Sequence, residues 1–227
     1  GISLAAEGGA HQSVATPLIG IGQPGMVAFE PAFVDELAAV MAWSFEHMQA
    51  PEGGSVYLRL STRRLEQPRR ALTPELEKEL IEGAYWLVPP APGADLALVF
   101  TGAVAPEVQE AHRQIAQDLP GAGLLAVTSA DRLHAGWRQG AGDEPSPAER
   151  LLGALAPDAR LITVLDGHPA SLSWLGSVRG QRVHALGVDR FGQSGDIPDL
   201  YRIYGIDTEA ILEAVAEACL ARLAPGV

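Results

Sequence analysis

The chain has 227 residues, of which 47% are apolar, so it can bury a hydrophobic core and is not an intrinsically disordered protein. Its formal net charge of −12 disfavours nucleic acid or an anionic membrane as a partner, because phosphate binding needs clustered lysine and arginine. Cys219 is the only cysteine, which excludes an internal disulfide and a cysteine-based zinc site and predicts a cytoplasmic protein, and no apolar run is long enough to span a bilayer.

The first part of the chain predicts a strand, a helix and a second strand. Residues 26–31 form a short apolar run that is typical of a buried strand. The alternating β-formers of residues 56–62 predict the second strand. Residues 31–48 between them show helical spacing. The expected apolar face of this helix consists of Phe33, Leu37, Val40, Met41, Phe45 and Met48.

The rest of the chain predicts alternating strands and helices. Residues 63–74 contain two prolines and several charges but no core pattern, and they predict a solvated interdomain linker. Strands are expected at residues 84–88, 95–102, 123–129, 160–167 and 182–188, and helices at 106–118, 129–137, 148–155, 171–178 and 207–223, with a further helix starting after Thr73. This alternation predicts an α/β fold with a mainly parallel sheet.

Residues 20–25, GIGQPG, spell the G-x-G-x-x-G pattern of dinucleotide-binding loops. Such a loop needs a strand before the first glycine, a helix that begins inside the motif, and an acidic residue about 20 positions further on at a strand end. Here Pro17 lies where the strand should end, a strand follows Pro24, and Glu46 falls inside the expected helix. We therefore predict a turn between a short helix and a strand.

Two other segments carry polar residues in suggestive places. Asp166 and His168 follow an expected strand at its carboxyl end, where α/β proteins bind ligands, although an ordinary loop histidine is the simpler interpretation. Arg190 is placed either to bind an anion or, more simply, to form a structural salt bridge. The remaining histidines have no companion at metal-ligand spacing. They are His47, His112, His134 and His184.

His11 has a different setting, because it follows two adjacent glycines and precedes Gln12 and Ser13. The glycines allow close approach of the backbone, and the imidazole can act as a general acid or base near neutral pH. The residues alone make His11 a candidate and no more, since terminal segments often carry idle histidines.

Residues 7–13, EGGAHQS, resemble the T-H-Q loop in the pyrimidine-binding domain of transketolase-type, thiamine diphosphate-dependent enzymes. Residues 187–215, GVDRFGQSGDIPDLYRIYGIDTEAILEAV, are similar to the V-D-x-F-G-x-S signature of that family and its continuation. Residues 29–41, FEPAFVDELAAVM, and residues 83–87, GAYWL, are most similar to the homodimeric, decarboxylating component of bacterial pyruvate dehydrogenase complexes. The resemblance covers nearly the whole chain.

The resemblance implies two domains and one site residue. Residues 1–66 would be the tail of the pyrimidine-binding domain, and residues 67–227 a complete transketolase-type C-terminal α/β domain with a mainly parallel sheet. His11 matches the loop histidine that lines the active site beside the thiazolium and substrate, where it would hydrogen-bond or protonate a substrate oxygen. The pyruvate branch usually has more than one histidine here, and this chain has one.

The same resemblance implies partners that these 227 residues do not include. The G-D-G…N motif that holds magnesium and the diphosphate is absent from the sequence. In the family it lies in an earlier domain, as does the glutamate that activates the aminopyrimidine. We therefore expect the C-terminal portion of a larger enzyme that uses thiamine diphosphate and magnesium. This chain alone is expected to bind neither tightly and to be inactive.

The function implied is decarboxylation of a 2-oxo acid, pyruvate first, with acyl transfer to lipoyl. Its partners would be the remaining N-terminal domains, a second copy in a homodimer and a lipoyl acyltransferase component. Two alternatives stay open. One is transketolase or another 2-oxo acid enzyme of the same superfamily. The other is a non-catalytic assembly subunit that completes a partner chain.

Overall fold

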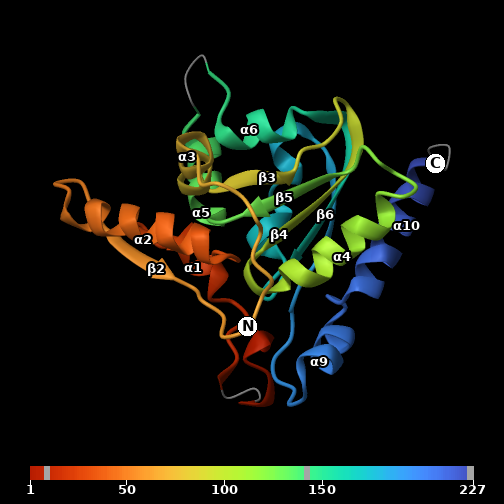
Figure 1. Cartoon of the computed structure of the whole chain (residues 1–227), viewed down its shortest axis with the longest axis horizontal. Helices are drawn as coiled ribbons and strands as arrows, with labels where there is room; N and C mark the ends of the chain where they lie inside the picture. The colour runs from red at the N-terminus through yellow and green to blue at the C-terminus, as the bar shows by residue number, and fades with distance from the viewer. Residues whose placement is uncertain (8–10, 141–143, 224–227) are drawn as a thin grey trace.

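The computed structural model describes residues 1–7, 11–140 and 144–223, and a five-stranded sheet lies at its centre (Figure 1). The strands are β3 (Ala84–Val88), β4 (Ala94–Thr101), β5 (Gly123–Val127), β6 (Leu155–Leu165) and β7 (Arg182–Leu186). Their order is β3-β5-β4-β6-β7. All neighbours are parallel except β3, which runs antiparallel to β5. The predicted α/β fold with a mainly parallel sheet is confirmed.

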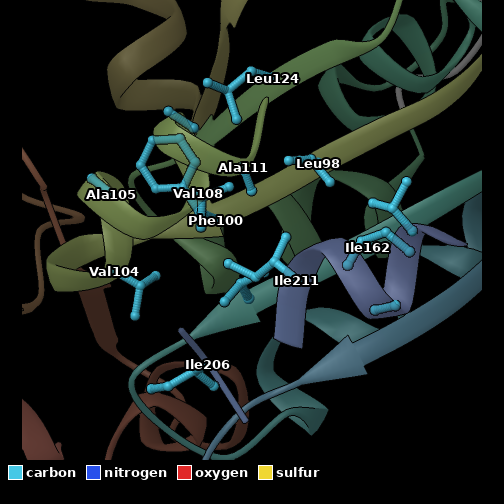
Figure 2. Packing of buried hydrophobic residues seen from close by; sticks show 14 of the residues in the cluster. Leu98, Phe100, Val104, Ala105, Val108, Ala111, Leu124, Ile162, Ile206 and Ile211 are labelled. Atoms are coloured by element: carbon cyan, nitrogen blue, oxygen red, sulfur yellow. The ribbon is translucent and has the colours of Figure 1, made fainter. Parts of the chain in front are cut away.

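Helices cover both faces of this sheet, because successive strand residues point to opposite sides and both sets are apolar. Leu98 and Phe100 of β4 pack toward α4 (Ala105–Ile115) and α10 (Thr208–Leu223), as Figure 2 shows. Ala97 and Val99 belong to a second cluster on the other face. The helices of that cluster are α5 (Ala130–Gln139), α6 (Pro147–Leu152), α7 (Ala170–Ser173) and α8 (Gly176–Arg179).

The first part of the chain forms a smaller parallel sheet of β1 (Met26–Phe29) and β2 (Ser55–Leu58). The 3₁₀ helix η1 (Ile2–Glu7) and α1 (Pro17–Gly22) precede it, and α2 (Val34–Gln49) connects its strands. Figure 1 shows α2 and β2 to the side of the larger sheet. The predicted turn at GIGQPG is confirmed, since α1 ends at Gly22 and Gly25, with φ of 77°, leads into β1.

Backbone and side-chain hydrogen bonds attach β1 to the larger sheet. The Ala28 N–H donates to Asp131 Oδ2 at 3.0 Å, and its carbonyl oxygen accepts from Ser129 Oγ at 2.6 Å. The Glu30 N–H donates to the Thr128 carbonyl oxygen at 2.7 Å. These contacts place the carboxyl end of β1 beside the carboxyl end of β5.

The face of α2 that is buried differs from the expected one. Phe33 and Val40 are buried as predicted, but Phe45 is 55% exposed and Met48 is 47% exposed. The residues of α2 that are buried are Glu36, Ala39, Val40 and Ser44. The buried face of α2 is therefore partly polar, because Glu36 accepts hydrogen bonds there. Apolar side chains of α2 lie on its exposed face instead.

Several elements differ from the sequence prediction, and the larger differences are these. The expected helix at 171–178 is two short helices, α7 and α8, and β2 ends at Leu58 rather than at residue 62. The helix expected to reach residue 155 ends at Leu152, where β6 soon begins. A helix that the sequence reading missed, α9 (Ile197–Tyr204), begins after Asp196, whose Oδ1 accepts from the Asp199 N–H.

The connector between β2 and α3 (Pro74–Glu82) has no regular structure, as predicted, but two of the four arginines in residues 63–74 are anchored rather than solvated. Arg63 forms a bidentate ion pair with Glu107, with Nη1 and Nη2 at 2.7 and 2.6 Å from its oxygens. Arg70 binds Asp35 through Nε at 2.6 Å. The connector therefore fastens the two parts of the chain together.

Among the described residues, no helix is both long enough and apolar enough to cross a bilayer.

Candidate functional site

A cleft of about 360 Å³ lies where the carboxyl ends of strands from both sheets meet. Glu30 follows β1, the segment 59–62 follows β2, and Asp166 follows β6. Ligands of open α/β sheets bind at the carboxyl ends of the strands, so this is the expected place for a site. His11 also lines the cleft.

Asp166 is 2% exposed and holds η1 against the end of β6. Its Oδ1 accepts from the Ile2 N–H at 2.6 Å, and its Oδ2 accepts from the Ser3 N–H at 2.9 Å. The hydroxyl groups of Ser3 and Tyr201 are 2.6 Å apart. Asp166 thus sets the path of the segment that leads to His11.

Glu30 and Arg59 form an ion pair in the wall of the cleft, with only 12% of each side chain exposed. Arg59 Nη2 also donates to the Asp166 carbonyl oxygen at 2.6 Å. Burial raises the pKa of Glu30, and the neighbouring Asp166 raises it further, while Arg59 opposes both. Burial opposes the charge on Arg59, but Glu30 and Asp166 outweigh it and keep the pKa of Arg59 above its usual value.

His11 is exposed, and the residue after it fixes its segment. Gln12 is 7% exposed, and its Nε2 donates to the Gln193 carbonyl oxygen at 2.8 Å. Gln193 belongs to the segment GVDRFGQS, so this hydrogen bond joins two stretches that are 181 residues apart. The glycines before His11, Gly8 and Gly9, lie outside the described residues.

The other sequence candidates have structural contacts. His168 does not line the cleft, and its Nδ1 accepts from the Ala170 N–H at 3.2 Å. Arg190 donates from Nη2 to the Ile203 carbonyl oxygen at 2.7 Å and lies over the Tyr204 ring. Asp166 is therefore the member of these segments that the fold brings to the cleft.

Sequence reasoning missed Glu30 and Arg59 as members of this site. A signal for Glu30 was present, since it directly follows an apolar run and precedes Pro31, a position at a strand end. Arg59 gave none, because an arginine within alternating β-formers is typical of a solvent-facing strand position.

Thiamine diphosphate with magnesium needs free oxygen ligands for the metal and donors for the phosphates. The acidic residues in the cleft do not fit this need, because both oxygens of Asp166 accept backbone N–H groups and Glu30 is paired with Arg59. In the part of the chain that the structure describes, no group of three or more His, Cys, Asp or Glu side chains is placed to hold a metal. We therefore assign no residue of this chain to the metal or the diphosphate.

Comparison with curated proteins gives one distant relative. The chain is 28% identical over 238 aligned residues to the pyruvate dehydrogenase E1 component of Mycolicibacterium smegmatis. The alignment covers 95% of this chain but 24% of the relative, so the chain spans about a quarter of that protein's length. No family model matches the chain.

Several solved structures with the same fold are transketolases. Transketolase from Leishmania mexicana has a TM-score of 0.76 and 18% identity, and the match covers 99% of this chain and 29% of that one. Transketolase from Campylobacter jejuni has a TM-score of 0.71 and 19% identity, with coverages of 95% and 30%.

A third structure, described as a split gene transketolase in an inactive β4 tetramer, has a TM-score of 0.63 and 18% identity. This match covers 92% of this chain and 62% of that one. The chain therefore has the α/β fold of the C-terminal region of transketolase and is a distant homologue of a pyruvate dehydrogenase E1 component.

Proposed function

We propose that this chain is the C-terminal portion of a thiamine diphosphate-dependent enzyme that decarboxylates a 2-oxo acid, pyruvate first, and passes the acyl group to lipoyl. The observation that carries the proposal is the identity to a pyruvate dehydrogenase E1 component along 95% of the chain. The hydrogen bond from Gln12 to Gln193 supports it, since it joins the His11 segment to the signature segment beside one cleft.

Within this proposal, His11 donates a proton or a hydrogen bond to a substrate oxygen. Its exposure leaves the imidazole accessible from the cleft, and an imidazole is a common general acid or base in enzymes. Glu30, Arg59 and Asp166 are positioning residues, because their contacts with one another and with η1 fix the wall that faces His11.

Thiamine diphosphate would supply the carbanion that attacks the 2-oxo acid. The residues of this chain that line the cleft do not fit the metal and diphosphate, so we propose that other segments or a partner chain hold them. We retain the proposed division into residues 1–66 and residues 67–227, together with a cytoplasmic location. A homodimer and a lipoyl acyltransferase component remain proposed partners.

Substrate profiling tests the proposed reaction. The full-length protein or the assembled complex is supplied with thiamine diphosphate and magnesium and assayed with pyruvate, 2-oxobutyrate and a ketose phosphate. We expect the highest kcat/KM with pyruvate, measured by dye-linked decarboxylation. Transfer of a two-carbon unit from the ketose phosphate to an aldose would instead assign the transketolase reaction. Inactivity on all three in a cofactor-loaded complex would favour an assembly subunit.

The outer face of α2 supports a partner that covers the smaller sheet. A parallel sheet is normally covered on both faces, and this one has only two strands. The helix α2 that connects these strands exposes three apolar side chains, Met41 (38%), Phe45 (55%) and Met48 (47%). The similarity of the chain to a split gene transketolase favours other domains of the same enzyme, whether in this chain or in a partner, as the occupant. The gene sequence upstream of Gly1 distinguishes these two arrangements.

Phe45→Ser is expected to weaken that association. An exposed aromatic side chain in the centre of an apolar face is a typical hot spot, so we expect about tenfold or more weaker assembly. The measurement is sedimentation velocity of the complex over a concentration series. Ile203→Ser is the matched control, because Ile203 is 49% exposed on α9, away from this face. Equal weakening by both variants, or by neither, would contradict the assignment of the α2 face.

A further inference from the structure

A cleft of about 220 Å³ between β6, β7 and α10 contains two arginines on neighbouring strands. Arg160 of β6 is the direct register partner of Arg182 of β7, so their side chains leave the sheet on the same face. His184 of β7 and Glu217 of α10 also line this cleft. It is remote from the site described above, because Arg182 begins β7 whereas Asp166 follows the opposite, carboxyl end of β6.

Two nearby aspartates are paired with another arginine, and the glutamate of the cleft lies beside a histidine. Arg222 pairs with Asp95 at 2.5 Å and with Asp158 at 3.0 Å. Glu217 Oε2 lies 3.8 Å from His184 Nδ1. Within residues 1–7, 11–140 and 144–223, neither Arg160 nor Arg182 has a carboxylate within 4.0 Å.

Arg160 also has a buried donor without a partner. Its Nε is buried and has no hydrogen-bond acceptor among the residues that the structure describes. Buried guanidinium donors are normally satisfied, and like charges directly opposite each other on neighbouring strands repel. Two arginines side by side, neither with a carboxylate within 4.0 Å, therefore repel each other, and an anion bound between them would relieve this repulsion. This pair of positive charges stands out because the chain as a whole carries a net charge of −12.

The size and donor geometry of the cleft narrow the class of anion. Its volume is below the range of about 300–1,000 Å³ that is usual for drug-sized ligands, so it suits a small group. A guanidinium presents its N–H groups as a planar fork that binds two oxygens at once. Two forks on adjacent strands match the three or four oxygens of a tetrahedral oxyanion, whereas a carboxylate offers two. We propose that Arg160 and Arg182 bind a phosphate group, as inorganic phosphate or as a small phosphate monoester.

Calorimetric titration of the purified protein tests this proposal. Inorganic phosphate and glycerol 3-phosphate are titrated at constant ionic strength in an oxyanion-free buffer. Succinate is titrated in parallel as a carboxylate for comparison. We expect submillimolar binding of at least one of the two phosphate compounds. The compound that binds more tightly shows whether the ligand is free phosphate or a phosphate monoester. Arg160→Gln and Arg182→Gln are each expected to lower the affinity about tenfold or more. Arg179→Gln is the control, because Arg179 is exposed on α8 and does not line the cleft.

A second readout separates lost binding from lost folding. Without phosphate, Arg182→Gln is expected to melt no lower than the unaltered protein, because it removes the repulsion from Arg160. Phosphate is expected to raise the melting temperature of the unaltered protein and of Arg179→Gln only. The proposal is overturned if phosphate does not bind at about 10 mM, if succinate binds more tightly than both phosphate compounds, or if the cleft variants bind phosphate like the control.

Discussion

Replacing His11 by alanine is expected to lower the turnover of the assembled enzyme by about 10²–10⁴, the usual contribution of a positioned acid or base. The reason is local, since His11 is exposed in the cleft that the strand ends form and its segment is held in place through Gln12. The loss is expected in kcat rather than in KM, because proton donation develops in the transition state. The measurement is steady-state kinetics of the cofactor-loaded enzyme on its best 2-oxo acid.

His168→Ala is the matched control for this prediction. His168 is a loop histidine in the same layer of strand ends, but it does not line the cleft and hydrogen-bonds to the local backbone. We expect its kcat to stay within about twofold of the unaltered enzyme, since it has no contact with the proposed substrate position. Both variants should keep the melting temperature, because surface substitutions of this kind usually change stability little. An unchanged rate in His11→Ala would remove His11 from the proposed active site.

The sequence could indicate His11 but not the group of residues around its cleft. His11 stands out locally, because two glycines precede it and because its segment resembles the T-H-Q loop of transketolase-type enzymes. Glu30, Arg59 and Asp166 come together only through the relative placement of β1, β2 and β6. That placement depends on contacts between residues 107 to 164 positions apart in the chain, such as Arg59 with Asp166 and Ile2 with Asp166. Patterns within a short window carry no information about such pairs.

The fold itself was largely predictable, because β4, β5 and the second half of β6 are buried on both faces and are therefore continuous apolar runs. The strands of the larger sheet lie where β-formers cluster between turn residues, except that β6 begins at Leu155, before its predicted start at residue 160. The antiparallel direction of β3 was not predictable, since the direction of a strand depends on the length and path of its connections and leaves no mark in the strand. The missed α9 has the polar start GDIPD, which resembles a turn.

The α2 error has a specific physical cause that also makes a prediction. Counting apolar residues favours the stripe that ends in Met48, yet Glu36 is 1% exposed. Its Oε2 accepts from the Ala32 and Phe33 N–H groups at 2.7 and 3.1 Å, and its Oε1 accepts from Tyr85 Oη at 2.5 Å. Four contacts, the fourth from Arg70 Nη2 at 3.4 Å, reduce the cost of burying the carboxylate without cancelling it, since burial still raises the pKa of Glu36.

Glu36→Ala is therefore expected to destabilise the fold by about 3 kcal/mol or more, since it removes one partner of a buried charged network. Tyr85→Phe is expected to cost about 1–3 kcal/mol, because it leaves the carboxylate without its hydroxyl donor. Glu36→Gln is not conservative here, because its NH₂ group would face donors on either side. The measurement is urea unfolding followed by circular dichroism.

The pH dependence gives a further check on Glu36. Burial raises its pKa, so the folded protein binds this proton more tightly than the unfolded chain does. The stability that Glu36 contributes is thus fully present below its unfolded value near 4.5 and decreases as the pH rises through the folded value. The cost of Glu36→Ala should shrink over that window. Glu46→Ala, an exposed glutamate on the same helix, should change stability by no more than about 0.5 kcal/mol at any pH.

A double-mutant cycle of Glu36→Ala with Tyr85→Phe measures the energetic coupling between the first part of the chain and the larger sheet. Glu36 lies on α2 in the first part, and Tyr85 lies on β3 in the second. Arg70, from the connector, donates to Tyr85 Oη at 2.7 Å. A coupling energy above about 0.5 kcal/mol would mean that α2 docks on β3 in solution as it does in the structure. Additive effects would contradict that docking, and the α2 face proposed for the partner would then lose its fixed orientation toward the cleft.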